Sequence, residues 1–478
     1  MNLNETKIST DADINASLRV SLLALFGGAA VWLVVGLALG VIASLTFHKP
    51  DMFANCSLLT YGRVAPAAND ALLYGFCIPA GLGVILWIFA RLGQTPLALP
   101  IVPVVAANLW HLGVFIGLAG ILVGETSGHT WLEFSRAASV LLFAAFLVIA
   151  VTAAATFGAR HERELHPTHW FLFAALLWFP WIYSTANLLL AANAPVRGVV
   201  QPIIGWWFAN NLVFVWLALV GVGTAFYLLP KIAARPLATT GYALFAFLTL
   251  IFFGAWCGIP AGAPVPAWLP TLSSLAGGLL IVPLIAIAII VIKTVTSAKV
   301  SCSGGPFCFT KFGMVCFILS GLMYAVAACP KYSRVLEFTW FGPAQVQLQL
   351  LGFFAMIMFG AIYELLPRVM NAELPFPKLA RLHFWVSIVG VALFVFPLLI
   401  AGIAQGIKLQ HANVALADAN TAALMFLRIS STGQLLLLFG ALLFAVNIFA
   451  MTIKWKLVLF KTALAAIKAP LPVSEVKA

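Results

Sequence analysis

The chain has 478 residues, of which 63% are hydrophobic and only 8% are charged. Soluble domains carry about one quarter charged residues, because their surface must meet water. The composition therefore predicts an all-α integral membrane protein, and it excludes a soluble enzyme, a nucleic-acid-binding protein and a secreted domain held by disulfides. The net charge of +12 is attributed to cytoplasmic loops rather than to contacts with nucleic acid.

The chain is predicted to have three parts: an N-terminal tail over residues 1–18, a membrane domain over 19–453 and a basic C-terminal tail over 454–478. The first apolar stretch is longer than the core of a signal peptide, so we expect a retained span. A helix needs roughly 20 apolar residues to cross the hydrocarbon core of a membrane. Twelve predicted spans follow, at residues 19–46, 69–90, 98–123, 137–157, 169–192, 205–229, 239–257, 270–292, 312–329, 346–366, 382–404 and 432–453.

An even number of spans places both tails on one side of the membrane. Most of the 26 Lys and Arg residues fall in these tails or in the loops on the same side. Because positively charged loops stay in the cytoplasm, both termini are predicted to be cytoplasmic.

Polar residues within or beside the spans are candidates for function. His111 lies inside the third span, where it is either a functional ionisable group or a neutral imidazole bonded within the bundle. Asp70 opens the second span and is expected to cap that helix. Glu364, near the cytoplasmic end of the tenth span, is either a proton relay or the partner of Lys231 or Arg368 in an ion pair.

The loop after the third span concentrates polar side chains. Glu125 and His129 have helical i, i+4 spacing, which would suit a metal or proton-entry site. Gly128 between them disfavours a helix, so a solvated loop that docks a partner subunit is the preferred interpretation. Cys302 and Cys308 are predicted to lie on the reducing cytoplasmic side, where a disulfide is not expected.

Four segments, in order, resemble subunit I of the haem-copper oxidases, and the cbb3-type branch most. Residues 61–69, Tyr-Gly-Arg-Val-Ala-Pro-Ala-Ala-Asn, are similar to the family's aromatic-Gly-Arg-x-Arg-Pro-x-His-Thr. Residues 205–211, Gly-Trp-Trp-Phe-Ala-Asn-Asn, are similar to its Trp-Trp-Tyr-Gly-His-Asn. Residues 256–268 keep its Trp-x-Gly and a later Pro-x-Trp, and residues 344–363 keep the Gly and the Phe-Gly-x-x-Tyr that follow its Gly-His-x-His. The resemblance implies a bundle of twelve transmembrane helices in three four-helix arcs.

The histidines that hold cofactors in that family are missing here. In the family, histidines of spans two and ten bind two haems, and a histidine of span six with a pair after span seven binds copper. The segment that replaces the pair, 258–264, contains no His and no Tyr. The other matching positions are Ala68, Asn210, Gln345 and Gln347.

These substitutions lead to the expectation that no haem or copper is bound and that no residue is catalytic. Alanine offers no lone pair, and amide oxygens are poor ligands for haem iron or copper. The two glutamines are interpreted as amides that pack between helices. Large side chains are expected to fill the vacated space, because voids forfeit packing energy; they are Phe208, Trp216, Phe353, Phe354 and the region of Trp256.

Three functions are compatible with these observations. The favoured one is a degenerate subunit I that acts as a scaffold or docking subunit of a respiratory complex in a bacterial-type inner membrane, beside other membrane subunits and cytochrome c-type subunits. The second is an active terminal oxidase or nitric oxide reductase subunit with displaced ligands. The third is a twelve-helix transporter. The first is preferred because only one of the eight histidines, His111, lies well inside a predicted span.

Overall fold

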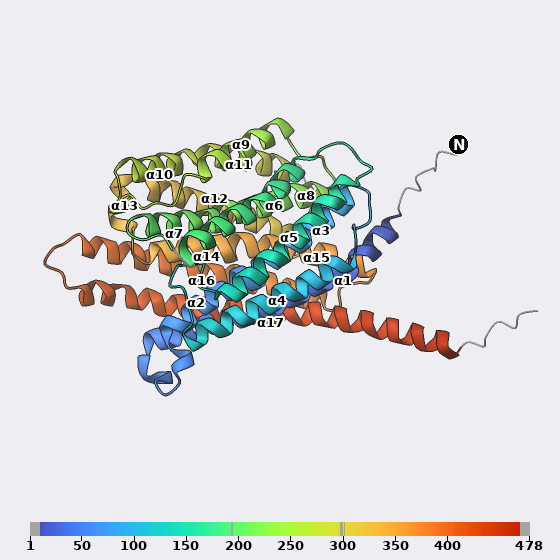
Figure 1. The fold of residues 1–478 in the computed structure, drawn as a ribbon, viewed down its shortest axis with the longest axis horizontal. Coiled ribbons are helices and arrows are strands. Elements are labelled where there is room, and N and C mark those ends of the chain that lie inside the picture. Colours follow the sequence, from blue (N-terminus) through green and yellow to red (C-terminus); the bar gives the residue numbers. More distant parts are fainter. Residues whose placement is uncertain (1–9, 193–194, 297–299, 301, 469–478) are drawn as a thin grey trace, which may run out of the picture.

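The computed structural model describes residues 10–192, 195–296, 300 and 302–468, and over these residues it contains helices and no strand. Residues 1–9 and 469–478 of the predicted tails lie outside this range. The helices are packed side by side into one bundle (Figure 1). In chain order the α-helices are α1 (Asp11–His48), α2 (Tyr61–Asp70), α3 (Ile78–Leu92), α4 (Ile101–Val123), α5 (Arg136–Gly158), α6 (Pro167–Ala186), α7 (Val200–Asn210), α8 (Leu217–Ala233), α9 (Thr240–Gly254), α10 (Trp268–Leu279), α11 (Ile281–Thr296), α12 (Pro306–Ala328), α13 (Pro330–Leu336), α14 (Phe341–Gln347), α15 (Met356–Met370), α16 (Pro377–Leu409) and α17 (Leu416–Lys468).

Each of the twelve predicted spans corresponds to one helix or to one continuous stretch of helix. Within the described residues, eleven helical stretches are long and apolar enough to cross a membrane. Each coincides with one predicted span, and several combine two labelled helices. The seventh predicted span is α9, which has only 15 residues and is shorter than the other spans. The membrane-spanning helical fold is therefore confirmed, with one short helix among the twelve.

The first and last helices extend into the regions that were predicted to be tails. Thr10 caps α1, because its hydroxyl accepts from the Asp13 amide at 3.3 Å and its own amide donates to the Asp13 carboxylate at 3.1 Å. Part of the predicted N-terminal tail is therefore helical. At the other end α17 continues to Lys468, beyond the predicted end of the membrane domain. The start of α1 and the end of α17 lie at the same end of the bundle (Figure 1), as an even number of spans requires.

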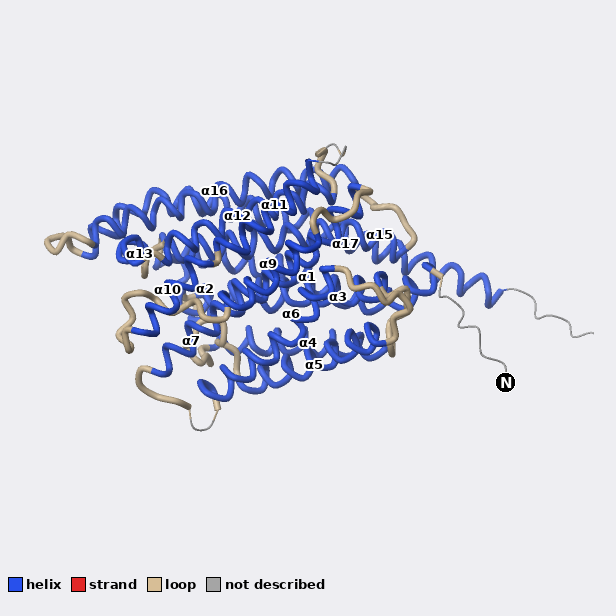
Figure 2. Tube along the Cα trace, turned by 90° about the horizontal axis from the view of Figure 1, so that it is seen from above, coloured by secondary structure: helices blue, strands red, loops and turns tan. Residues whose placement is uncertain are grey.

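Three continuous stretches of helix form the centre of the bundle. They cover residues 61–92, 200–233 and 341–370, and 100%, 94% and 89% of their apolar stretches are buried. The other described spans are at most 44% buried, since they present one face to the outside. α16 and α17 form a hairpin that projects from one end, and α4 and α5 lie on the side opposite α16 (Figure 2).

The second span begins earlier than the sequence indicated. Its helix starts at Tyr61, and Asp70 lies within the continuous helix with 1% of its surface exposed. The prediction that Asp70 caps this helix is therefore wrong. The polar segment before Asp70 hides the true start, because hydropathy alone cannot show that α1 and α4 cover it.

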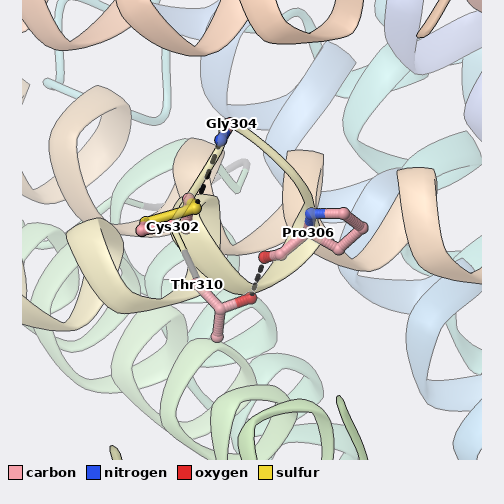
Figure 3. The surroundings of a disulfide bond; sticks show 5 residues. Cys302, Gly304, Pro306 and Thr310 are labelled. Atoms are coloured by element: carbon pink, nitrogen blue, oxygen red, sulfur yellow. Dashed lines mark hydrogen bonds between the residues drawn. A yellow bond between two sulfur atoms is a disulfide. The ribbon is translucent and has the colours of Figure 1, made fainter. Parts of the chain in front are cut away.

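The prediction for Cys302 and Cys308, at the start of α12, is also wrong. Cys302 and Cys308 form a disulfide across the turn that leads into this helix (Figure 3). The amide of Gly304 lies 3.4 Å from the Cys308 sulfur and donates to it, and Thr310 donates to the Pro306 carbonyl at 2.9 Å. The sequence argument considered only the side of the membrane, whereas the turn brings the two Cα atoms to 5.4 Å.

Candidate functional site

The three central stretches of helix each contain a π-helical segment near a position where the sequence resemblance would place a ligand. Ala68 shortly precedes the segment Ala71–Cys77, and Asn210 directly precedes Asn211–Trp216. Gln347 directly precedes Leu348–Ala355, and Gln345 lies two residues before Gln347. Local π-helical geometry is frequent at functional sites, because it re-aims side chains at the cost of regular hydrogen bonds. The candidate site therefore lies in the buried middle of the bundle.

Asn210 links three elements through its carboxamide. Its side-chain nitrogen donates to the Gly254 carbonyl at 3.0 Å, and its oxygen accepts from the Tyr324 hydroxyl at 2.7 Å. Its Cβ also approaches Gly258, whose φ of +109° favours glycine. Both ends of the amide are thus used in contacts between helices.

The two glutamines of α14 are less completely bonded. Gln347 donates from its nitrogen to the Asn69 side-chain oxygen at 3.1 Å, which joins α14 to α2. The oxygen of Gln347 and the nitrogen of Gln345 are buried and have no hydrogen-bond partner among the described residues. Such atoms are costly to bury, and each unsatisfied group destabilises by about 1–3 kcal/mol.

The loop that replaces the histidine pair is held by a carboxylate that the sequence analysis did not single out. Glu337 accepts from the backbone amides of Ala261 at 2.7 Å and Gly262 at 3.3 Å. The amide of Ile259 donates to the Ser273 hydroxyl at 3.0 Å. No sequence motif marks Glu337, because it lies far along the chain from the loop that it binds.

Aromatic side chains fill much of the centre, as expected. Phe208, Trp216, Phe353 and Phe354 are fully buried, and the Trp216 and Phe354 rings lie 6.3 Å apart. The expectation fails for Trp256, which is 53% exposed and fills no interior space.

The expectation also fails beside Ala68 and Gln347, where a cavity of about 210 Å³ remains. It lies between α1, α2, α14, α16 and α17, and we call it the amide cavity. Asn69, Gln347 and Gln434 supply carboxamides to its wall. Small residues on α1 and α2 leave this space open, so side chains replace only part of the volume.

Two buried carboxyl groups meet at one side of the site. Asp70 lies near Glu133 of the loop before α5, and neither Asp70 oxygen has a hydrogen-bond partner among the described residues. Two neighbouring carboxyl groups in a buried environment disfavour each other's charged form. Burial raises the pKa of Glu133 from 4.5 to about 7. Hydropathy could not reveal this pair, because one partner is in a span and the other is in a loop.

His111 is bonded within the bundle. Its Nε2 donates to the Ala24 carbonyl at 3.2 Å, and its ring lies against Gly28, where a Cβ would collide with it. His383, which the sequence places at the edge of a span, is buried and shares a 3.1 Å hydrogen bond with the Tyr363 hydroxyl. Interior histidines therefore exist, but they contact backbone and tyrosine.

The remaining candidates lie apart from the centre. Glu125 is exposed, while His129 lies 3.2 Å from the Gln201 side-chain nitrogen on α7. Burial lowers the pKa of His129. Glu364 forms an ion pair with Arg368 one turn further along α15. No group of three or more His, Cys, Asp or Glu side chains suited to a metal ion occurs among the residues that the structure describes.

Known proteins with similar sequences are oxidase subunits. The chain is 24% identical over 398 residues to the Cbb3-type cytochrome c oxidase subunit CcoN1 of Stutzerimonas stutzeri, covering 80% of this chain and 83% of the relative. It is 26% identical over 453 residues to a cytochrome c oxidase subunit 1 homolog of Azorhizobium caulinodans, covering 88% and 80%. A heme-copper terminal oxidase dimer solved by cryo-EM contains a chain with the same fold, with a TM-score of 0.75 at 14% identity over 91% of this chain and 84% of that one.

These relatives correct the expectation that no cofactor is bound. They are subunits of oxidases, and the structural neighbour is a heme-copper enzyme, so the family points to haem and copper. The side chains at the four matching positions do not fit the ligands of these groups, because none is an imidazole and Asn210 is already bonded at both ends.

The family model for cytochrome c and quinol oxidase polypeptide I matches residues 21–436, which includes all three central helices. Fold, order of motifs and relatives agree, and the chain belongs to this family of haem-copper oxidase subunits I.

Proposed function

We propose that this chain is a scaffold and docking subunit of a multi-subunit respiratory complex in a bacterial inner membrane. Its membrane domain over 19–453 would hold neighbouring membrane subunits, with cytochrome c-type subunits among them. Both tails would face the cytoplasm, as the bias of Lys and Arg suggests.

The main support for the proposal is the set of hydrogen bonds made by Asn210 and Gln347, at positions where the family has ligands. Asn210 ties α7 to the end of α9 and to α12 through Gly254 and Tyr324. Gln347 ties α14 to Asn69 of α2. At two of the positions where the family binds metals, Asn210 and Gln347 join helices instead, which suits a structural role.

A second set of contacts supports the same role. Glu337 fixes the loop that stands where the family has its histidine pair. The loop is held by two charge-assisted hydrogen bonds to its backbone, which are stronger than neutral ones. A fixed loop at the end of the bundle offers a constant surface to a neighbouring subunit.

The test is purification of the tagged chain from its native membranes in a mild detergent. We expect other membrane subunits and a haem c protein to co-purify, and we expect their assembly to fail in a strain that lacks this chain. Assembly is followed by native gel electrophoresis and mass spectrometry.

Oxygen consumption by the purified material separates the alternatives. If this chain alone reduces oxygen with a supplied electron donor, it is an active oxidase with displaced ligands and the scaffold role is wrong. If it purifies without partners and moves a solute in liposomes, it is a transporter.

A further inference from the structure

An open groove of about 370 Å³ lies between the end of α5, the start of α6 and the middle of α9, and we call it the outer groove. Leu165 and Leu177 on its wall are 48% and 63% exposed, so the groove opens to the outside of the bundle. Apart from one histidine the wall is aliphatic and aromatic, and it comprises Phe157, Leu165, His169, Trp170, Phe173, Ala174, Leu177 and Phe247. A groove of this composition on a membrane-spanning bundle favours hydrocarbon over water.

The outer groove has the length of one membrane leaflet. It follows α6 (Pro167–Ala186) from His169 near the start of the helix to Leu177, about 12 Å further at 1.5 Å per residue. Half of the hydrocarbon core of a membrane is about 15 Å thick. Trp170 lies beside His169, and tryptophan is typical of the interface between membrane and water. The groove therefore runs from an interfacial end to an apolar end.

Two hydrogen-bond donors at the interfacial end have no partner among the described residues. His169 is 3% exposed, and its Nδ1 accepts from the His166 amide at 3.0 Å. In a neutral imidazole the proton is then on Nε2, which is buried and unpartnered. The Nε of Arg160 is also buried without a partner. Because buried donors are normally paired, these two indicate a ligand that supplies acceptor oxygens.

Arg160 is held in place beside the groove. Its guanidinium lies 4.1 Å from the centre of the Phe157 ring and donates from Nη1 to the Phe157 carbonyl at 3.0 Å. The Phe157 ring lies 5.3 Å from the His169 ring. The His161 amide donates to the Gly93 carbonyl at 2.9 Å, which ties the loop that carries Arg160 to the end of α3. The positive charge at the interfacial end is therefore positioned before any ligand arrives.

The donors indicate a phosphate group. The loop carries Arg160 and Arg163 but also the exposed Glu162 and Glu164, so its net charge does not select an anion. Neither glutamate forms an ion pair with Arg160 within the part of the chain that the structure describes. An arginine forms directed, charge-assisted hydrogen bonds to phosphate oxygens, which suits its free Nε–H.

We propose that the outer groove binds one phospholipid of the adjacent leaflet. The phosphate accepts hydrogen bonds from Arg160 and from Nε2 of His169. One acyl chain lies along Phe173, Leu177 and Phe247 and covers their apolar surface. The site goes beyond the scaffold role and does not depend on it.

The test uses the purified full chain, freed of lipid in detergent. It is titrated with dioleoyl phosphatidylglycerol or with dioleoylglycerol, which has the same acyl chains and no phosphate. Native mass spectrometry counts the bound lipids and measures the dissociation constants. We expect one tightly bound phosphatidylglycerol per chain, with dioleoylglycerol bound at least tenfold more weakly. Arg160→Gln and His169→Phe should each weaken binding of phosphatidylglycerol about tenfold and leave that of dioleoylglycerol unchanged, because each removes one donor to the phosphate.

Two control variants match the test variants. Arg163→Gln removes an exposed arginine of the same loop and should bind phosphatidylglycerol as the wild type does. Leu177→Trp narrows the groove from its exposed side and should abolish tight binding while the chain stays monodisperse. Leu188→Trp, at a leucine that is 67% exposed on the same span and outside the groove, should not. Equal affinity for the two lipids, an equal effect of Arg160→Gln and Arg163→Gln, or unchanged binding in Leu177→Trp overturns the proposal.

A second measurement distinguishes a lipid from a neighbouring subunit. A photo-crosslinking residue in place of Leu177, activated in the native membrane, should capture phospholipid. Capture of another protein overturns the proposal, because a helix of that protein then occupies the groove. Failure of the scaffold proposal would appear in the assembly of partners and would leave phospholipid binding by the purified chain intact.

Discussion

The buried carboxyl group of Asp70 in the second span lies near the carboxyl group of Glu133 in the loop before α5. Tyr74, one turn after Asp70, donates from its hydroxyl to the Trp131 carbonyl at 2.6 Å, which fixes the same loop. The Trp110 indole in turn donates to the Tyr74 carbonyl at 2.8 Å. These contacts fix the loop beside the two carboxyl groups, and burial there raises the pKa of Glu133.

Replacement of Glu133 by Gln should change how stability depends on pH. The pKa of Glu133 in the folded chain is about 7, above its ordinary value of 4.5, because the group is buried. A raised pKa means that the folded state holds the proton more tightly, so this stabilisation is present below pH 4.5 and is lost as the pH rises through about 7. We expect the wild type to lose on the order of 1–3 kcal/mol over this window, and Glu133→Gln to lose much less. Thermal unfolding between pH 5 and 8 measures the difference.

The control for that measurement is Glu125→Gln, which removes an exposed carboxylate from the same loop. It should keep the pH dependence of the wild type. A flat profile in the wild type, or equal profiles for the wild type and Glu133→Gln, would contradict the raised pKa of Glu133.

Gly28→Ala should destabilise the bundle. A Cβ at this position would collide with the His111 ring, which is held by the Ala24 carbonyl. Overpacking of this kind costs about 1–3 kcal/mol. The neighbouring Gly27→Ala is the control, since nothing lies within 4 Å of a Cβ there. Melting temperatures of the two variants in detergent provide the comparison, and equal values would show that the ring moves freely.

The contact between Asn210 and Tyr324 should show coupling in a double-mutant cycle. Asn210→Leu leaves the Tyr324 hydroxyl without its acceptor and the Gly254 carbonyl without its donor, at a cost of about 1–3 kcal/mol for each group. Tyr324→Phe removes only one bond and should cost less. In the double variant the hydroxyl is absent, so the combined loss should be smaller than the sum of the single losses. Strictly additive unfolding energies would mean that the two groups act independently.

Glu337→Ala should loosen the loop over residues 258–264. The variant removes the acceptor for the Ala261 and Gly262 amides, so both should exchange with deuterium faster. Exchange of the Ile259 amide, which is bonded to Ser273, should change less. Glu373→Ala, on the loop between α15 and α16, serves as the control. Unaltered exchange at Ala261 and Gly262 would show that Glu337 does not hold the loop.

Several features of the fold could be predicted because they are properties of single segments. A run of apolar residues long enough to cross a membrane is visible in the sequence, and all twelve runs became helices. The shortest, α9, ends at Gly254 and is followed by the irregular segment that leads to Trp268. The start of the second span was missed because burial by other helices, rather than its own hydropathy, keeps the segment before Asp70 helical.

The sequence by itself determined that this protein is a polytopic helical membrane protein of the oxidase family, and it identified Ala68, Asn210, Gln345 and Gln347 as the positions where the family has ligands. Only the tertiary structure decided what those positions do: Asn210 bonds to Tyr324, and Gln347 leaves an oxygen facing a cavity. The reason is physical. Hydropathy and motif order are local along the chain, whereas the pairing of Asp70 with Glu133, or of Glu337 with the loop at Ala261, depends on which helices pack together and how much water they exclude.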